Sequence, residues 1–150
     1  MPHLALPEIV PGVVTCLDTQ LLRSTGGSET NAQITDTEDR AVTDERDFLV
    51  VAVNMTASVC TAVPLFTKSS PGSAPLAADK RQGDVGSWLA ADVHFSRWQH
   101  WRIPLSALSI ASHNDPGDVD NRRSFALGDA DTLQDLANWA TRNRCAFRGV

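Results

Sequence analysis

The alternation of apolar and polar residues along the chain predicts several short strands. Gly12–Arg23 alternates apolar and polar positions, which is typical of a strand with one buried face. Phe48–Asn54 (FLVVAVN) is a short β-branched run and predicts a central strand. After a turn at Asn54–Ser58, Val59–Phe66 (VCTAVPLF) predicts its antiparallel partner. Pro64 has no N–H to donate to a strand ladder, so we expect an edge or a bulge at this residue.

Two polar segments, residues 24–45 and 68–86, predict long loops between the apolar runs. The first is 22 residues long with hardly a large apolar side chain, and such a loop in a small domain is usually functional or mobile. Ser87–Phe95 alternates weakly and predicts a strand. Arg102–Ser112 fits either an extended segment or a short helix, and the pattern does not choose between them.

The C-terminal third predicts one more strand and one helix. Residues 113–121 are rich in turn formers, and Arg122–Leu127 predicts a last short strand. Asp131 followed by Gln134 forms an N-terminal capping box, and the apolar residues after it share one helical face. We therefore expect a C-terminal helix near 131–142. Short strands, two long loops and this helix predict a mainly β fold, a small bent barrel or sheet with a helix packed on it.

Length and composition indicate one globular domain spanning residues 1–150. A chain of 150 residues with 42% apolar and 21% charged residues is long enough to bury a sizeable core. The net charge of −5 argues against a sequence-blind nucleic-acid binder, which would be basic overall, but it leaves room for a local basic groove.

Cysteine usage and the chain start predict a cytoplasmic protein with reduced thiols and no cofactor. Cys16, Cys60 and Cys145 are an odd number without paired spacing, and two of them lie in apolar runs. No spacing typical of metal ligands occurs, so we expect no metal. The first residues carry no basic leader, and no apolar run approaches the roughly 20 residues that span a bilayer, so we expect no membrane partner.

Aromatic and basic residues concentrate in Ser87–Arg102 (SWLAADVHFSRWQHWR), which holds three of the four tryptophans. Flat rings beside guanidinium groups can stack on bases and hold phosphates. The candidate substrate-binding residues are Arg97, Trp98, His100, Trp101 and Arg102. The same aromatics are also what a small β domain uses to fill its core, and both interpretations stay open for Trp101.

Three motifs in this order resemble the MazF/PemK (Kid) family of growth-inhibitor toxins of toxin–antitoxin pairs. They are RDFLVVAV, an arginine opening an apolar strand, then AVPLFT, a strand end with VP and a threonine, then WLAAD. A strand, a long loop and a C-terminal helix complete the order, over roughly residues 11–142.

This resemblance implies an SH3-like small barrel with a C-terminal helix, assembled as a homodimer and controlled by an antitoxin. It implies metal-independent endoribonuclease cleavage of single-stranded RNA that leaves a 2′,3′-cyclic phosphate and a 5′-hydroxyl. The strand-opening arginine corresponds to Arg46, the strand-end threonine to Thr67 and the aspartate to Asp92. His94 is our own candidate for proton transfer, because a metal-free reaction needs a side-chain acid and base.

Two departures from the family pattern keep other functions open. Asp47 stands where the family has a proline, so a carboxylate lies beside the proposed phosphate contact, and Val93 replaces a glutamine. One alternative is a non-catalytic SH3-like barrel that binds a protein or peptide through the aromatic cluster. Another is an accessory domain that binds the sheet edge of a partner. Expression of the chain alone separates these, because a toxin arrests growth and a binding module does not.

Overall fold

The computed structural model describes residues 4–32, 43, 45–68, 73–76, 81–82, 92–96, 99–112, 123–125 and 147–150. These residues form a mainly β fold with antiparallel strand pairing, as the sequence predicts. The strands are β1 (Val13–Asp18), β2 (Glu29–Thr30), β3 (Glu45–Asn54), β4 (Val59–Phe66), β5 (Ser73–Pro75), β6 (Arg81–Gln82), β7 (His94–Ser96), β8 (Trp101–Pro104), β9 (Arg123–Phe125) and β10 (Arg148–Gly149). The helices are the 3-10 turn η1 (Leu6–Glu8), α1 (Thr19–Thr25) and α3 (Leu105–Ala111).

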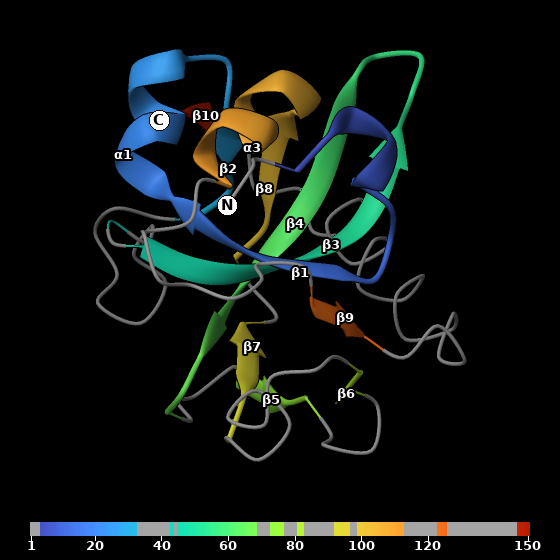
Figure 1. The fold of residues 1–150 in the computed structure, drawn as a ribbon. Helices are drawn as coiled ribbons and strands as arrows, with labels where there is room; N and C mark the ends of the chain where they lie inside the picture. Colours follow the sequence, from blue (N-terminus) through green and yellow to red (C-terminus); the bar gives the residue numbers. More distant parts are fainter. Residues whose placement is uncertain are drawn as a thin grey trace.

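The β3–β4 hairpin is the centre of the sheet. The strand order is β10-β2-β8-β4-β3-β1-β9-β6, and β7 pairs with both β4 and β5 away from this path. Figure 1 shows α1 and α3 on one side of the crossing of β1 and β3, and β5, β6, β7 and β9 on the other side. The predicted pairing of the FLVVAVN and VCTAVPLF runs is confirmed, with Phe48 opposite Pro64 and Asn54 opposite Val59. A register shift between Val50 and Ala52 adds a bulge on the β3 side.

Pro64 lies where β4 changes its partner strand. On the side away from β3, β4 pairs with β8 up to Ala62 and with β7 from Leu65 onward. A residue without an N–H is tolerated in such an interval between two ladders. The expected irregularity at this proline is therefore found as a change of partner inside the sheet.

The central strands bury both of their faces, and this explains why FLVV is a continuous apolar run. Side chains alternate between the two faces of a strand. Phe48 and Val50 belong to one hydrophobic cluster, whereas Leu49 and Val51 belong to another. We call the first cluster the helix-side core and the second the pocket-side core. The pocket-side core consists of Val14, Leu49, Val51, Val63, Leu65, Leu76, Val93 and Phe95.

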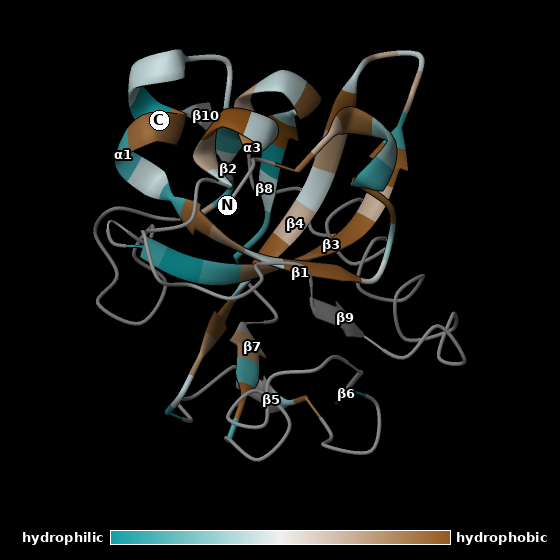
Figure 2. Cartoon of the chain, in the orientation of Figure 1, coloured by the Kyte–Doolittle hydropathy of each residue, from teal (hydrophilic) through white to brown (hydrophobic). Residues whose placement is uncertain are grey.

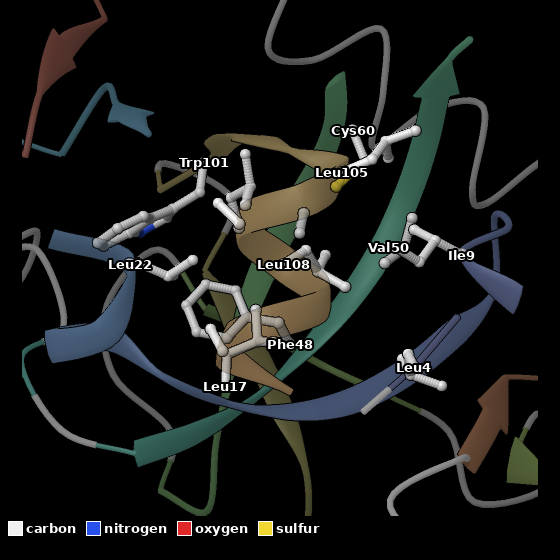
Figure 3. Packing of buried hydrophobic residues seen from close by; sticks show 14 of the residues in the cluster. Leu4, Ile9, Leu17, Leu22, Phe48, Val50, Cys60, Trp101, Leu105 and Leu108 are labelled. Atoms are coloured by element: carbon white, nitrogen blue, oxygen red, sulfur yellow. The ribbon is translucent and has the colours of Figure 1, made fainter. Parts of the chain in front are cut away.

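The helix-side core is the larger cluster and contains the aromatic pair Phe48 and Trp101. Their ring centroids lie 5.7 Å apart at an interplanar angle of 83°, an edge-to-face arrangement typical of buried aromatics. Figure 3 shows Phe48, Trp101 and Leu22 converging with Leu108 of α3. The other buried members are Leu4, Ile9, Leu17, Ala32, Val50, Cys60, Ala62, Ile103, Leu105, Ala107 and Ala111.

The single strand expected over Gly12–Arg23 is wrong in its second half. The strand ends at Asp18, whose carboxylate accepts hydrogen bonds from the backbone N–H groups of Gln20 (2.9 Å) and Leu21 (3.3 Å). This is an N-cap, and it starts α1 by satisfying donors that have no partner inside the helix. The alternating pattern continues into the helix, but the cap overrides it.

The two expected long loops contain short strands where they are described. β2 lies within 24–45, and β5 and β6 lie within 68–86. Isolated two- and three-residue strands carry no periodicity for a sequence pattern to show. The undecided segment 102–112 is strand up to Pro104 and helix from Leu105.

The remaining predicted elements are confirmed in part or lie outside the described residues. The last short strand is present as β9, and β7 occupies the end of the strand expected over Ser87–Phe95. The C-terminal helix near 131–142 and the loop 113–121 fall on residues that are not described. Within the described residues the outer strands β10 and β6 do not pair with each other, so the sheet is not closed and the SH3-like barrel is not confirmed.

Two further features bear on the expected cell compartment and partners. None of the helices among the described residues is long and apolar enough to cross a membrane. Cys60 is buried and Cys16 is half-buried, and these two described cysteines form no disulfide with each other. Burial raises the pKa of the Cys60 thiol from its ordinary value of 9.0 to about 12. This thiol therefore acts as a small apolar side chain in the helix-side core.

Candidate functional site

A pocket of about 300 Å³ lies where the start of β3 meets the end of β4. The two ends meet because the hairpin is antiparallel, with Phe48 opposite Pro64. Figure 2 shows hydrophilic residues at the start of β3, next to the apolar middle of the strand. The pocket is lined by Glu45, Arg46, Asp47, Leu65, Phe66, Thr67 and Val93. Its lining therefore combines charged and apolar side chains.

Arg46 is half-buried and is held by the end of β4. Its Nη1 donates a hydrogen bond to the carbonyl oxygen of Leu65 at 3.2 Å, and its guanidinium carbon lies 4.6 Å from the centre of the Phe66 ring. A cation over an aromatic face is attracted by the ring quadrupole. These two contacts fix the guanidinium at the pocket wall, because the long arginine side chain would otherwise sample many rotamers.

Thr67 lines the same pocket from the first residue after β4. Its side chain is exposed, so the hydroxyl is accessible to a ligand. Arg46 and Thr67 are 21 positions apart in the sequence (67 minus 46), and the hairpin brings them to one cavity. Their proximity follows from the register of β3 against β4.

The segment that leads into β7 contributes one residue to the pocket lining. Val93 lines the pocket, and it stands between exposed Asp92 and half-buried His94. His94 pairs across the strands with Phe66, a lining residue. The Nδ1 atom of His94 is buried and has no hydrogen-bond partner among the described residues. The structure therefore brings all four predicted catalytic residues to the pocket or to its immediate border.

The pocket carries more negative than positive side chains. Glu45 and Asp47 flank Arg46 in the sequence, and all three line the cavity. The lining then has one guanidinium and two carboxyl groups, and this excess of acidic groups disfavours an anion. The sequence already placed the carboxylate of Asp47 beside the proposed phosphate contact. Although side chains alternate between the two faces of β3, Asp47 still lines the pocket.

Two of the predicted substrate-binding residues are in the interior. Trp101 and His100 are both 0% exposed, and the Trp101 indole N–H donates to the Gln99 side-chain oxygen at 2.8 Å. We therefore remove both side chains from the candidate binding surface. Trp101 fills the helix-side core, which is the core role that the sequence had left open.

Arg102 is exposed but does not line the pocket. Its guanidinium stacks on Phe147, with the carbon 3.7 Å from the ring centre, beside the C-terminal strand β10. Its backbone lies between Thr61 of β4 and Glu29 of β2. Arg102 thus helps to hold the C-terminal segment. Arg97 and Trp98 lie outside the described residues.

Sequence reasoning missed Glu45, Leu65 and Phe66 as parts of the site. The signal was available in the predicted hairpin, because the Phe48–Pro64 register places residues 45–47 beside residues 65–67. Among the residues that the structure describes, no group of three or more His, Cys, Asp or Glu side chains could hold a metal ion.

Comparisons with known proteins do not identify a family. A scan against protein-family models, a search of curated proteins and a search of solved structures each find no match to this chain. The function is therefore argued from the pocket and its residues.

Proposed function

We propose that the protein is a metal-independent endoribonuclease that cleaves single-stranded RNA in the pocket between β3, β4 and β7. The observation that supports this most directly is the convergence of Arg46 and Thr67 in one cavity, with Asp92 and His94 at its border. Arg46, Thr67 and Asp92 correspond to residues of the MazF/PemK-like motifs, and His94 is the separate candidate for proton transfer. A cationic group, a hydroxyl and two groups able to transfer protons are sufficient for phosphodiester transesterification.

In the proposed reaction the ribose 2′-oxygen attacks the adjacent phosphorus while the bond to the 5′-oxygen breaks. The proton of the 2′-hydroxyl passes to a side-chain base, and a side-chain acid supplies a proton to the leaving 5′-oxygen. Asp92 and His94 are the candidates for these two roles. Arg46 stabilises the additional negative charge on the phosphate oxygens, and the Thr67 hydroxyl donates to one of them. The products are a 2′,3′-cyclic phosphate and a 5′-hydroxyl.

The proposal extends to the resemblance with the MazF/PemK family. In this view the sheet is the described part of an SH3-like barrel, the active form is a homodimer in the cytoplasm, and an antitoxin segment occupies the RNA groove. The strand order and the central β3–β4 hairpin are compatible with such a fold. Native mass spectrometry of the purified chain gives the oligomeric state directly.

The decisive experiment is RNA cleavage in excess EDTA with Arg46→Ala and Arg46→Lys variants. We expect discrete cuts with the wild type and a loss of about 100-fold or more in rate with Arg46→Ala, as for removal of a preorganised charge donor. Arg46→Lys keeps the charge but loses the planar fork, so we expect it to recover only part of the rate.

The matched control is Arg23→Gln, which removes an arginine at the end of α1. The Arg23 guanidinium lies 5.9 Å from the centre of the Trp101 ring and does not line the pocket. This variant should cleave RNA like the wild type. Full activity of a folded Arg46→Ala protein would exclude the assignment, and an inactive wild type at high concentration would exclude the ribonuclease function itself.

The acidic lining favours a second candidate function, non-catalytic binding of a basic segment of a protein or peptide. In this function Glu45 and Asp47 supply the carboxylates that bind a lysine or arginine of the partner at the pocket. Because Trp101 is buried in the core, the binding surface for this second function is the pocket, and not the whole tryptophan cluster that the sequence predicted.

Neutralising the two carboxylates separates the two functions, because the expected changes in binding have opposite signs. If the ligand is RNA, Asp47→Asn and Glu45→Gln remove repulsion and should tighten RNA binding by several-fold at low salt. If the ligand is a basic peptide, the same substitutions remove its counter-charge and should weaken binding. Fluorescence anisotropy with a labelled single-stranded RNA and with a labelled Lys/Arg-rich peptide gives the sign in each case.

A further inference from the structure

Arg81 is a charged residue with an unusual position. Its side chain is only 8% exposed, although arginine is rarely buried without a partner. Nε and Nη2 both donate to the carbonyl oxygen of Leu76, at 3.2 and 2.6 Å. A fork of two N–H groups on one oxygen fixes the position and the direction of that carbonyl.

The residue that Arg81 holds is joined in turn to the pocket wall. The backbone N–H of Leu76 donates to the carbonyl oxygen of Val93 at 2.8 Å, and Val93 lines the pocket. The Leu76 side chain is 2% exposed and packs in the pocket-side core with Val93. Two sets of hydrogen bonds, joined through the backbone of Leu76, therefore connect the Arg81 guanidinium to the carbonyl of Val93, which stands between Asp92 and His94.

Arg81 also links two parts of the sheet. Its strand β6 pairs with β9, which pairs with β1, whereas β5 pairs with β7, which pairs with β4. Its side chain reaches from the first group to Leu76, which directly follows β5. Burial lowers the pKa of the Arg81 guanidinium, and the opposite charge of Asp92 raises it, so the two charges lie within electrostatic range.

We propose that Arg81 is a positioning residue that sets the placement of Asp92 and His94 at the pocket through the Leu76–Val93 hydrogen bonds. A buried guanidinium is costly to desolvate, and an apolar residue could fill the same space at lower cost. The geometry accounts for an arginine here, because the two bonds to Leu76 need a rigid fork of donors. The effect of Arg81 on catalysis rests on the proposed ribonuclease function, but its effect on the position of Leu76 and Val93 does not.

The first measurement is hydrogen exchange of single backbone amides in wild type, Arg81→Lys and Arg81→Met. We expect the Leu76 amide to exchange at least 10-fold faster in Arg81→Met, because the carbonyl on the same residue is released. The Leu105 amide, which donates to the carbonyl oxygen of Ser58 and belongs to neither β5 nor β7, is the internal reference and should not change. Equal acceleration at both amides would mean general destabilisation and would overturn the proposal.

The second measurement is the kinetics of RNA cleavage by the same variants. Misplacement of reacting groups by about 1 Å costs on the order of 100-fold in rate, so we expect kcat to fall between 10- and 100-fold in Arg81→Met. KM should stay within about twofold, because Arg46 and Thr67 are not moved. Arg81→Lys can donate one bond to Leu76 and should recover part of kcat.

The control is Arg23→Gln, for which both kcat and the Leu76 exchange rate should match the wild type. If Arg81→Met leaves kcat unchanged, or if Arg81→Lys recovers nothing in a folded protein, the positioning role is wrong. If the wild type cuts no RNA, the proposed function is wrong. The exchange rates of the Leu76 amide hydrogen still decide whether Arg81 positions the Leu76–Val93 segment.

Discussion

The two hydrophobic cores share β3 and β4 but differ in size, composition and cover. The helix-side core contains Phe48 and Trp101, both 0% exposed, and α1 and α3 pack against it. The pocket-side core is smaller and mostly aliphatic, and two of its members, Val93 at 7% and Phe95 at 8%, approach the surface. The pocket lies at the open end of this hairpin and takes residues from both sides of it, because Leu65 and Val93 belong to the pocket-side core whereas Phe66 packs against the helix-side core. The smaller core thus supplies two pocket residues, and ligand-binding regions are commonly drawn from the less stable part of a fold.

The largest effect should come from Trp101→Ala. Removal of a fully buried tryptophan leaves a large cavity and costs about 3–5 kcal/mol of unfolding free energy. Urea denaturation followed by circular dichroism measures this change. Met55→Ala is the control, because Met55 is 68% exposed in the β3–β4 turn and should change stability by less than about 0.5 kcal/mol. If Trp101→Ala loses less than about 1 kcal/mol of unfolding free energy, the helix-side core does not contribute more to stability than the pocket-side core.

Alkaline pH should also act on the helix-side core, through Cys60. Its pKa in the folded protein, about 12, lies above the ordinary value of 9.0. Between these values the unfolded chain loses the thiol proton and the folded chain retains it. This contribution to stability is complete below pH 9 and should fall by about 1.4 kcal/mol per pH unit above it.

The measurement is urea denaturation at several pH values from 8.5 to 10.5 (roughly the lower half of the window) for wild type and Cys60→Ala. The alanine variant lacks the thiol, so its stability should fall less steeply with pH. Parallel curves for the two proteins would show that Cys60 is not shielded from water.

A smaller loss is expected from Val93→Ala in the pocket-side core. Two methyl groups at about 0.8 kcal/mol each predict a cost of about 1–2 kcal/mol. Because Val93 also lines the pocket, ligand binding should change more than stability does. Thermal denaturation and binding titration on the same sample test this, and Val93→Ile, which keeps the apolar contact, serves as the control. If Val93→Ala costs as much as Trp101→Ala, the two cores are not distinct in strength.

Removal of the α1 cap should cost about 1 kcal/mol. Asp18→Ala deletes the acceptor for the N–H groups of Gln20 and Leu21, and α1 covers the helix-side core. Asp18→Asn retains a side-chain oxygen and should be close to wild type. Chemical denaturation of the three proteins gives the order, and an Asp18→Asn protein as unstable as Asp18→Ala would assign the effect to charge, not to capping.

The smallest effect should be a gain from Ser58→Gly at the end of the hairpin turn. Ser58 has φ of +56°, a left-handed conformation that costs a non-glycine residue about 1–2 kcal/mol. Glycine relieves this strain but adds about 0.5–1 kcal/mol of entropy to the unfolded chain. We expect a net stabilisation of a few tenths of a kcal/mol to about 1 kcal/mol. Ser58→Ala should not be more stable than wild type.

The sequence predicted the central part of the fold because that part has a clear pattern. Phe48–Asn54 and Val59–Phe66 are apolar runs joined by a short turn, and the structure pairs them as expected. The chain was misread at Thr19–Thr25, where the apolar spacing continues and only the capping geometry of Asp18 reveals the helix. Very short strands such as β2 and β6 depend on long-range pairing, which no local pattern shows.

The candidate site was predictable to the extent that it lies at strand ends. Arg46 and Thr67 were singled out from motifs, and the hairpin register explains why they line one pocket. The burial of His100 and Trp101 was not predictable, because an amphipathic aromatic segment fits a core and a surface equally well. The sequence also offered no reason to select Arg81 as a positioning residue. The proposed role depends on its hydrogen bond to the carbonyl of Leu76, and no sequence motif indicates that contact.

Pro64 has a consequence for the hydrogen-bond balance of the interior. This residue is buried, and it lies between the part of β4 that pairs with β8 and the part that pairs with β7. Any other residue would place a backbone N–H donor in this buried interval, and a buried donor without an acceptor is destabilising, whereas proline has no N–H. The residue that interrupts the ladder therefore also removes a donor that would need a partner, and a Pro64→Val protein should unfold at a lower urea concentration than the wild type.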